Sequence, residues 1–260
     1  VEDGPFYMIN LIQYREKAVY PDGRKTDLAG HEANNLYNPI DILREIGAEI
    51  VFVAQVEKMR LGDGTKWDQV AIVRYPSRQA FVQMTQRPDF QARSIHKDAG
   101  VGKTIVMVSQ LVESRAPGGL TLAKPPHPAT ADDRPFEMVQ VLRYRDTAQY
   151  ESGTAAPAIS GREAMEEYEA AAGAVMASMG VYRTARFEIE GVFIGDGRSW
   201  DEVRIHYFPS HATLERHLAS ASRTEAEHHR AAALEDAYTM QTLPMFNRLG
   251  RRSGSVTQER

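Results

Sequence analysis

The sequence has no cysteine among its 260 residues. Disulfides, thiolate nucleophiles and cysteine-ligated metal sites are therefore excluded. A chain without cysteine suits a reducing compartment, and we expect this one to be cytoplasmic.

Long apolar runs and a strong excess of one charge are also missing. Since no stretch of about 18 apolar residues occurs, we expect no membrane-spanning helix. The net charge of −4 gives no electrostatic reason to expect nucleic acid or an acidic membrane as a partner. A hydrophobic content of 42% with 25% charged residues is typical of a globular protein with a substantial core.

Motifs for cofactors and nucleophiles are absent as well. The chain contains no Gly-x-Gly-x-x-Gly motif and no P-loop, so nucleotide cofactors are not expected. It also lacks the Gly-x-Ser-x-Gly elbow of serine hydrolases. Eight histidines are present, but none has a carboxylate–histidine spacing that is diagnostic of a metal site. We therefore predict no cofactor and no metal-binding residue.

The sequence does contain an internal repeat. Residues 62–77 match residues 195–210 at a constant offset of 133 (195 − 62), and both copies have the pattern Gly-Asp-Gly-x-x-Trp-Asp followed by Tyr or Phe, Pro and Ser. The repeat predicts two units of similar length. We place the first repeat at 1–112, a Pro/Gly-rich linker at 113–134, the second repeat at 135–248 and a polar tail at 249–260.

Each repeat has the predicted order strand, helix, strand, strand, helix, strand. Hydrophobic periodicity places the first helix of each repeat at about 31–46 and 161–179. Each of these helices ends at a glycine, which tolerates the positive φ common at that position. Ser77 and Ser210 are predicted to cap the second helices.

The βαββαβ unit with these motifs, and with a His-Lys or His-Arg pair near its end, resembles a domain-of-unknown-function family in the dimeric α/β-barrel superfamily. The resemblance covers nearly the whole chain apart from the linker and tail. It implies an α+β protein in which two tandem ferredoxin-like repeats pack sheet to sheet as a closed barrel. Relatives in the superfamily include cofactor-free monooxygenases, muconolactone-type isomerases, polyketide cyclases and haem enzymes. The fold thus indicates where a site lies but not which reaction it runs.

The first strand of each repeat has two distinct faces at period two. One face is purely apolar, and the other has an amide in its middle. We expect the amide-bearing face to line a cavity inside the barrel. The face predicted inside carries Met8, Asn10, Met138 and Gln140, and the face predicted under the helices carries Ile9, Leu11, Val139 and Val141.

The two copies differ most on one face of a later strand. Glu202, Arg204 and His206 project from the same side at intervals of about 7 Å. The first copy has Gln69, Ala71 and Val73 at these positions. A face that is mostly apolar in one copy is expected to be interior in both, where charge is costly unless it is paired or used. The pairs Val53/Arg186 and Met84/His217 follow the same trend, so we predict the working site in the second repeat.

These residues predict a cofactor-independent acid–base enzyme of the lyase or isomerase type. It would cleave or shift a C–C or C–O bond in a small, aromatic or oxyanion-bearing metabolite, as in aromatic compound metabolism. His206 would exchange the proton, and Glu202 would orient His206 or act as a second acid or base. Arg204 would hold an anionic oxygen. The predicted substrate-binding residues are Arg186, Gln140, Asn10, Tyr144, Trp200, Phe208 and His229.

Two other classes stay open. One is a non-catalytic barrel that binds a small molecule, and the other is a haem- or metal-dependent or cofactor-free oxygenase. Structural roles also compete, because Arg186 beside Glu202 would form an ion pair and His96 or His229 would stabilise a helix C-terminus. The expected partner is a small-molecule substrate, and a homodimer is left open.

Overall fold

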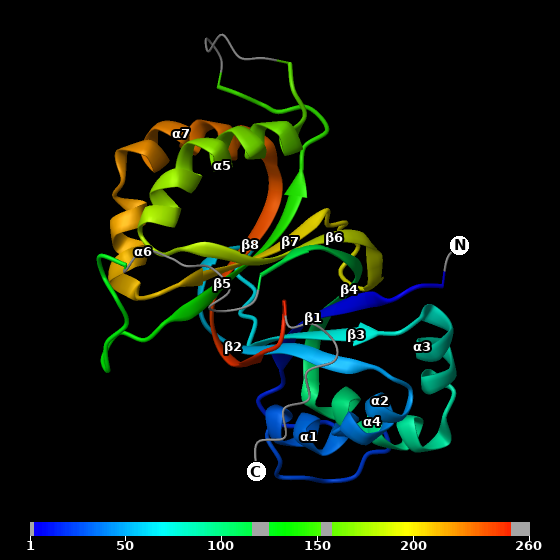
Figure 1. The fold of residues 1–260 in the computed structure, drawn as a ribbon. Coiled ribbons are helices and arrows are strands. Elements are labelled where there is room, and N and C mark those ends of the chain that lie inside the picture. Colours follow the sequence, from blue (N-terminus) through cyan, green and yellow to red (C-terminus); the bar gives the residue numbers. More distant parts are fainter. Residues whose placement is uncertain (1–2, 116–124, 152–157, 251–260) are drawn as a thin grey trace.

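The computed structural model describes residues 3–115, 125–151 and 158–250. Eight antiparallel strands close into one barrel in the order β1-β3-β2-β8-β5-β7-β6-β4 (Figure 1). The first repeat comprises β1 (Phe6–Tyr14), α1 (Gly30–Tyr37), α2 (Ile40–Glu45), β2 (Glu49–Leu61), β3 (Gln69–Tyr75), α3 (Arg78–Thr85), α4 (Pro88–Gly100) and β4 (Val101–Ser114). The second comprises β5 (Phe136–Tyr144), α5 (Gly161–Ser178), β6 (Tyr182–Ile194), β7 (Glu202–Phe208), α6 (His211–Leu218), α7 (Ala221–Ala233) and β8 (Leu234–Asn247).

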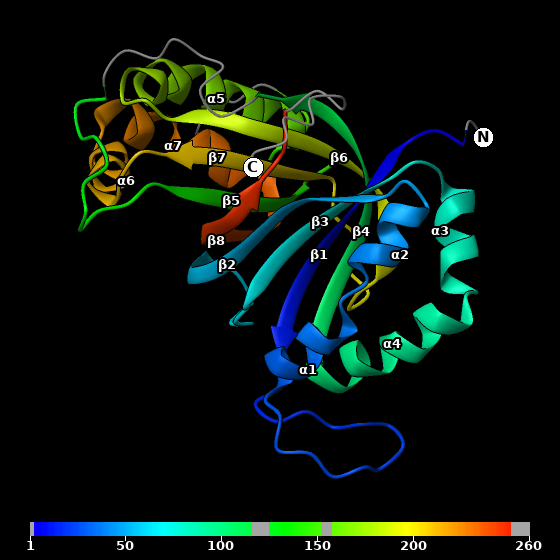
Figure 2. The ribbon, with the colours of Figure 1, turned by 60° about the horizontal axis from the view of Figure 1, so that its bottom comes forward.

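The two repeats meet along two strand pairs, β2 with β8 and β4 with β6. Figure 2 shows the strands between two groups of helices, with α1 to α4 on one side and α5 to α7 on the other. The predicted fold class, two ferredoxin-like repeats packed as a dimeric α/β-barrel, is confirmed. No helix within the described ranges is long and apolar enough to cross a membrane.

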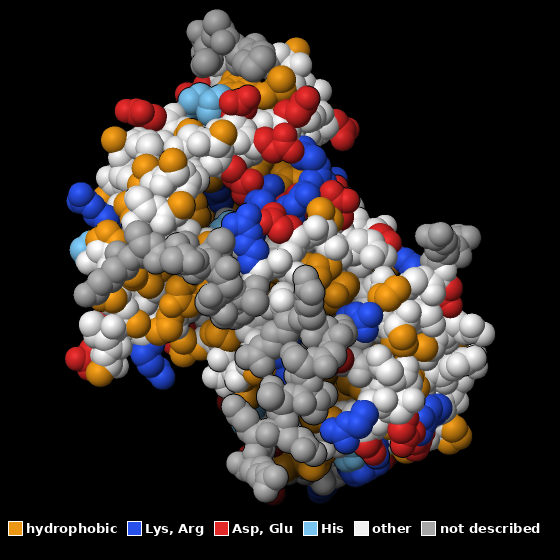
Figure 3. Space-filling model, in the orientation of Figure 1, with side chains coloured by type: hydrophobic (Ala, Val, Ile, Leu, Met, Phe, Trp, Pro, Cys, Tyr) orange, Lys and Arg blue, Asp and Glu red, His pale blue; other side chains and the backbone are white. Residues whose placement is uncertain are grey.

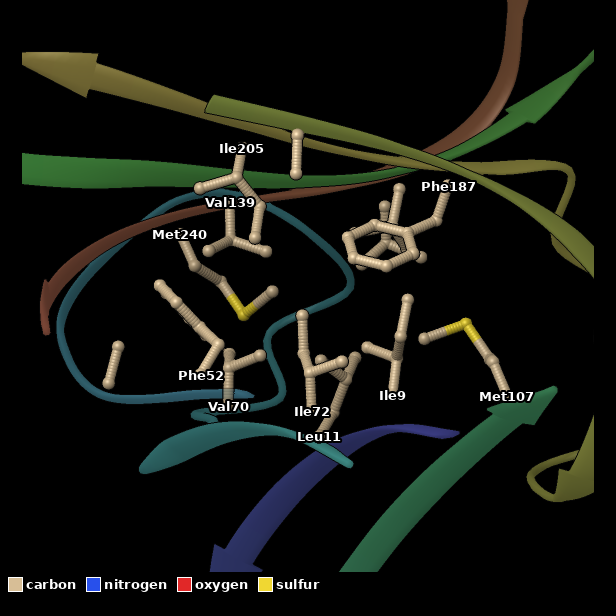
Figure 4. Close-up of a cluster of buried hydrophobic side chains, with 14 of the residues drawn as sticks. Ile9, Leu11, Phe52, Val70, Ile72, Met107, Val139, Phe187, Ile205 and Met240 are labelled. Carbon is tan, nitrogen blue, oxygen red and sulfur yellow. The ribbon is translucent and has the colours of Figure 1, made fainter. Parts of the chain in front are cut away.

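The inside of the barrel is a packed apolar core. Figure 4 shows side chains from both sheets facing one another across it. Ile9 and Leu11 from β1 meet Val139 and Val141 from β5 in this cluster, and all four are fully buried. The expected assignment of faces was therefore wrong. Met8 and Met138 lie on the opposite faces, in separate clusters between the sheets and their helices.

The repeated Trp-Asp motif ties each β-hairpin to the first strand of its repeat. The Asp68 and Asp201 carboxylates accept hydrogen bonds of 2.7 Å from the backbone N–H groups of Tyr14 and Tyr144. The preceding Trp200 is buried in the barrel core beside Tyr238, with ring centroids 5.2 Å apart. Trp200 comes before β7, which begins at Glu202, so it does not follow the alternation of that strand and does not share a face with Glu202.

The first helices of the two repeats differ. The helix predicted at 31–46 is two helices, because Asn38 at φ 22° and Pro39 interrupt it. In the second repeat α5 runs unbroken for 18 residues from its cap at Ser160. The break lets α2 place Ile42 and Leu43 against the sheet of the first repeat.

Both predicted caps of the second helices are confirmed. Ser77 and Ser210 accept hydrogen bonds from the backbone N–H groups of Ala80 and Thr213. Part of the predicted linker binds the α6 end, where His127 O accepts a 2.7 Å hydrogen bond from Ser210. Linker residues 116–124 and tail residues 251–260 lie outside the described part of the chain.

Candidate functional site

A cavity of about 720 Å³ lies between the sheet of the second repeat and helices α5 to α7. This volume is in the range of sites that enclose a small organic molecule. Figure 3 shows acidic and basic side chains gathered between α5 and β6, around a hollow in the surface. Much of the lining is apolar, with Met138, Met165, Ala172, Met176, Val181, Phe208 and Leu214.

Two histidines face this cavity without a hydrogen-bond partner among the described residues. His206 on β7 is 9% exposed, and Nδ1 of His217 on α6 is buried and unpaired. Burial lowers the pKa of His206 to about 3, with further lowering by the charges of Arg204 and Arg183. Burial likewise lowers the pKa of His217 to about 4. Both imidazoles are therefore neutral at neutral pH.

Two further polar groups lie on the sheet side of the cavity. Gln140 on β5 lies in register with Thr239 on β8 and with Arg204 on β7. The hydroxyl of Thr239 is buried and unpaired, and the Gln140 amide makes no side-chain hydrogen bond within the described ranges. A buried polar group without a partner destabilises a fold by about 1–3 kcal/mol, so the Thr239 hydroxyl is suited to bind a polar atom of a ligand, with the half-buried Gln140 amide beside it.

Arg204 reaches the cavity from a dense ion-pair network. It is 4% exposed and donates to the carboxylates of Glu202 and Glu169, and its Nη2 donates to the Tyr144 hydroxyl over 3.0 Å. Glu202 also pairs with Nη1 of Arg162 at 2.7 Å. Arg204 is thus held in one position by three acceptors.

Glu202 is fully buried behind Arg204 and does not line the cavity. Burial alone would raise its pKa, but the charges of Arg204, Arg162 and Arg186 outweigh burial and lower it. Nη1 of Arg186 lies 3.4 Å from the Glu202 carboxylate. Glu202 is therefore an ionised counterion for these arginines.

Arg183 joins the two repeats beside the cavity. Its guanidinium pairs with Glu113 of β4 at 2.6 Å and with Glu169 of α5 at 3.1 Å. Arg183, Glu169, Tyr168, His217 and Thr239 line the cavity but were not among the predicted site residues. A signal existed for Arg183 and His217, because Ile50 and Met84 occupy the equivalent positions of the first repeat.

The predicted site residues fall into three groups. His206, Arg204, Gln140 and Phe208 line the cavity, and Glu202, Arg186 and Tyr144 support it through the ion-pair network. The other three lie elsewhere. Asn10 donates to Ala71 O over 3.3 Å in the first repeat, Trp200 is in the barrel core, and His229 Nδ1 bonds the Tyr150 hydroxyl at 2.8 Å.

The equivalent space in the first repeat is filled. Val73 and Met84 take the places of His206 and His217, and they pack with Ile42 and Leu43 of α2. Within residues 3–115, 125–151 and 158–250, no group of three or more histidines and acids is arranged to hold a metal ion.

No protein-family model and no curated protein matches the chain. Two crystal structures of the RPA0582 protein, one described as a protein of unknown function from Rhodopseudomonas palustris, are 32% and 30% identical, with TM-scores of 0.39 and 0.38. Each match covers 48% of this chain and 86% of that one. The crystal structure of an anthrone oxidase-like protein covers 98% of this chain and 97% of its own at 12% identity, with a TM-score of 0.51, and is similar in fold alone. The strand order and this likeness agree on the fold, which is that of the dimeric α/β-barrels.

Proposed function

We propose that the protein is an enzyme that moves a proton on a small, largely apolar, oxygen-bearing molecule bound in the second-repeat cavity. The observation that supports it is the set of unpaired polar groups, His206, His217, Gln140 and Thr239, in an otherwise apolar enclosure. The first repeat fills the same space with hydrocarbon, so the fold itself does not require these groups.

In this proposal His206 accepts the proton from an acidic C–H or O–H group of the substrate. Its pKa of about 3 keeps the unliganded imidazole neutral, with a free lone pair, across the neutral pH range. The negative charge formed on the substrate oxygen offsets the positive charge gained by the imidazole. Arg204 and Arg183 lie near enough to His206 to affect its pKa, and they would stabilise that oxyanion.

Return of the proton to another atom gives an isomerase, and its transfer to a departing group gives a lyase. Glu202 acts through Arg204 in this scheme, because its buried carboxylate is occupied by three arginines. A substrate with an aromatic ring would pack against Phe208 and Met138.

A second candidate, a non-catalytic binding protein, is favoured by one observation. An imidazole with a pKa of about 3 is a weak base, and general-base catalysis is most efficient when the pKa lies near the working pH. The two candidates share the cavity but differ in whether a proton is exchanged.

A measurement of proton exchange distinguishes the enzyme from the non-catalytic binding protein. Wild-type protein and His206→Gln would be incubated in deuterated buffer with a panel of hydroxyaromatic acids and enolisable ketones, and deuterium uptake would be followed by mass spectrometry. The enzyme proposal expects uptake with the wild type only. Binding of a compound by the wild type without exchange would favour the non-catalytic candidate, and equal uptake in both proteins would remove His206 as the proton carrier.

A further inference from the structure

Helix α7 presents two arginines to the cavity wall. Arg223, Glu227 and Arg230 are spaced at i, i+4 and i+7 and so lie on one helix face. Arg223 Nη2 and Arg230 Nη1 each lie 3.0 Å from a carboxylate oxygen of Glu227. Neither arginine makes another ion pair within the described ranges, so two cations share one carboxylate.

These two charges are only partly hydrated. The side chains of Arg223 and Arg230 are 23% and 18% exposed, and both line the cavity. Burial raises the pKa of the Tyr168 hydroxyl on α5 and the nearby charge of Arg223 lowers it, and the unpaired Nδ1 of His217 lies on the neighbouring helix. This end of the cavity therefore offers several hydrogen-bond donors and an excess positive charge.

The first repeat shows that the fold does not need these arginines. At the same offset of 133, Phe90 replaces Arg223 and Lys97 replaces Arg230. Phe90 packs in the apolar cluster that fills the first repeat, and Lys97 Nζ lies 5.8 Å from the centre of the Tyr37 ring. The second repeat thus has a guanidinium where the first has a partly buried phenyl ring packed against the core cluster.

The rest of the lining adds to this positive potential. Its two acids, Glu113 and Glu169, are both paired with Arg183. A partly enclosed space with more cations than anions attracts anionic ligands. The cations that line the cavity are Arg60, Arg115, Arg183, Arg204, Arg223 and Arg230.

We propose that Arg223 and Arg230 bind a carboxylate of the molecule that occupies the cavity. The ligand class is then an apolar organic anion whose body lies along Met165 and Met176 and whose reactive end faces His206. A guanidinium suits this role, because its planar fork matches a carboxylate. This inference rests on the proposed function, since it takes the cavity to be a small-molecule site, and it adds a separate anion subsite on α7.

A matched pair of fluorescent probes tests it. The anion 8-anilinonaphthalene-1-sulfonate, whose sulfonate stands in for the carboxylate, would be compared with neutral N-phenyl-1-naphthylamine, which lacks the charged group. We expect the wild type to bind the anion about tenfold more tightly. The Arg223→Gln/Arg230→Gln double variant should lose about tenfold in affinity for the anion, as expected for a charged hydrogen bond, with no change for the neutral probe.

Three variants serve as controls. Arg93→Gln removes a charge from the outer surface of α4, where Arg93 pairs with Asp41, and should bind both probes like the wild type. Arg223→Lys/Arg230→Lys keeps the charge and should keep most of the preference for the anion, whether or not the glutamine variant folds. Gly173→Leu places a side chain in the cavity, where an added Cβ meets no atom within 4 Å, and should weaken both probes.

The failures of the two proposals are distinguishable. If Gly173→Leu weakens both probes but the wild type does not prefer the anion, or the glutamine variant keeps that preference, the anion subsite is overturned and the cavity remains a binding site. If Gly173→Leu leaves both probes unaffected, the probes bind elsewhere, and both the subsite and the proposed function are contradicted.

Discussion

Nη2 of Arg204 donates a 3.0 Å hydrogen bond to the hydroxyl oxygen of Tyr144, the one neutral acceptor among the three side chains that bind this guanidinium. The other two acceptors are carboxylates, of Glu202 and Glu169. Tyr144 therefore fixes the orientation of Arg204 without adding charge. It also ends β5, so the last residue of one strand positions the cation of its neighbour.

Removal of each partner should have a different effect on stability. Tyr144→Phe deletes one hydrogen bond and should lower the free energy of unfolding by about 1 kcal/mol. Arg204→Met removes one of the three arginines around the buried Glu202 carboxylate and should lower it by about 3 kcal/mol or more. Urea unfolding followed by circular dichroism measures both. Similar small losses in the two variants would show that Arg204 is not needed to neutralise Glu202.

Stability should fall in mild acid because of His206. The folded-state pKa of about 3 lies below the ordinary value of 6.5, so the folded protein binds this proton less readily than the unfolded chain. The contribution of the neutral imidazole is complete above pH 6.5 and is lost progressively toward pH 3. Between pH 7.5 and 5.5 we expect His206 to account for about 1.4 kcal/mol of lost stability.

His206→Gln should reduce this acid-dependent loss by about that amount in urea titrations at the two pH values. Val73→Ala is the matched control in the first repeat. It should lose about 1 kcal/mol of packing energy at both pH values and leave the pH dependence unchanged. A His206→Gln protein with the wild-type pH dependence would contradict the assignment.

Exchange of equivalent residues between the repeats should have opposite effects on stability. His217→Met removes an unpaired buried nitrogen and should raise the free energy of unfolding by about 1 kcal/mol, with loss of ligand binding. Met84→His introduces an imidazole into a filled apolar cluster and should lower it by about 2 kcal/mol or more. Thermal unfolding of the two variants provides the measurement. Equal destabilisation by both would mean that the second cavity is as tightly packed as the first.

Gly173 offers a way to block the cavity without damage to the fold. It lies inside α5, where leucine has a better helix propensity than glycine by about 0.8 kcal/mol, and space is free around its Cα. Gly173→Leu should keep or raise the melting temperature and abolish proton exchange, whereas Gly173→Ala should retain activity. Full activity in Gly173→Leu would place the site outside this cavity.

The two repeats should not be stable as separate monomers. Each half would expose the barrel face that carries Ile9 and Leu11, or Val139 and Val141, together with two unpaired edge strands. Residues 1–124 and 125–260, expressed separately, should be insoluble or self-associate in size-exclusion chromatography with light scattering. Two folded monomeric halves would refute the barrel as the unit of stability.

The internal repeat carries most of the information that the sequence gives about the fold. Turn glycines, period-two strands and capping serines occur twice, so the βαββαβ order of each repeat was predictable from local patterns. The comparison of Val73 with His206 also directed attention to the second repeat, where the cavity lies. These features depend on residues close together in the chain.

The sequence by itself determined which residues share a strand face. Only the tertiary structure decided which face points into the barrel and which face packs against the helices. Both faces of β1 and β5 are largely apolar, so alternation separates Ile9 from Met8 without showing which one points into the barrel. The pairing of β2 with β8 and of β4 with β6 closes the barrel and places Ile9 inside it. The cavity exists because the helices over the two sheets leave different amounts of space. In the first repeat α2, which begins after the break at Pro39, fills the space above the sheet, whereas the unbroken α5 of the second repeat leaves space above His206. Such a space is set by contacts between segments far apart in the chain, and local pattern does not specify them.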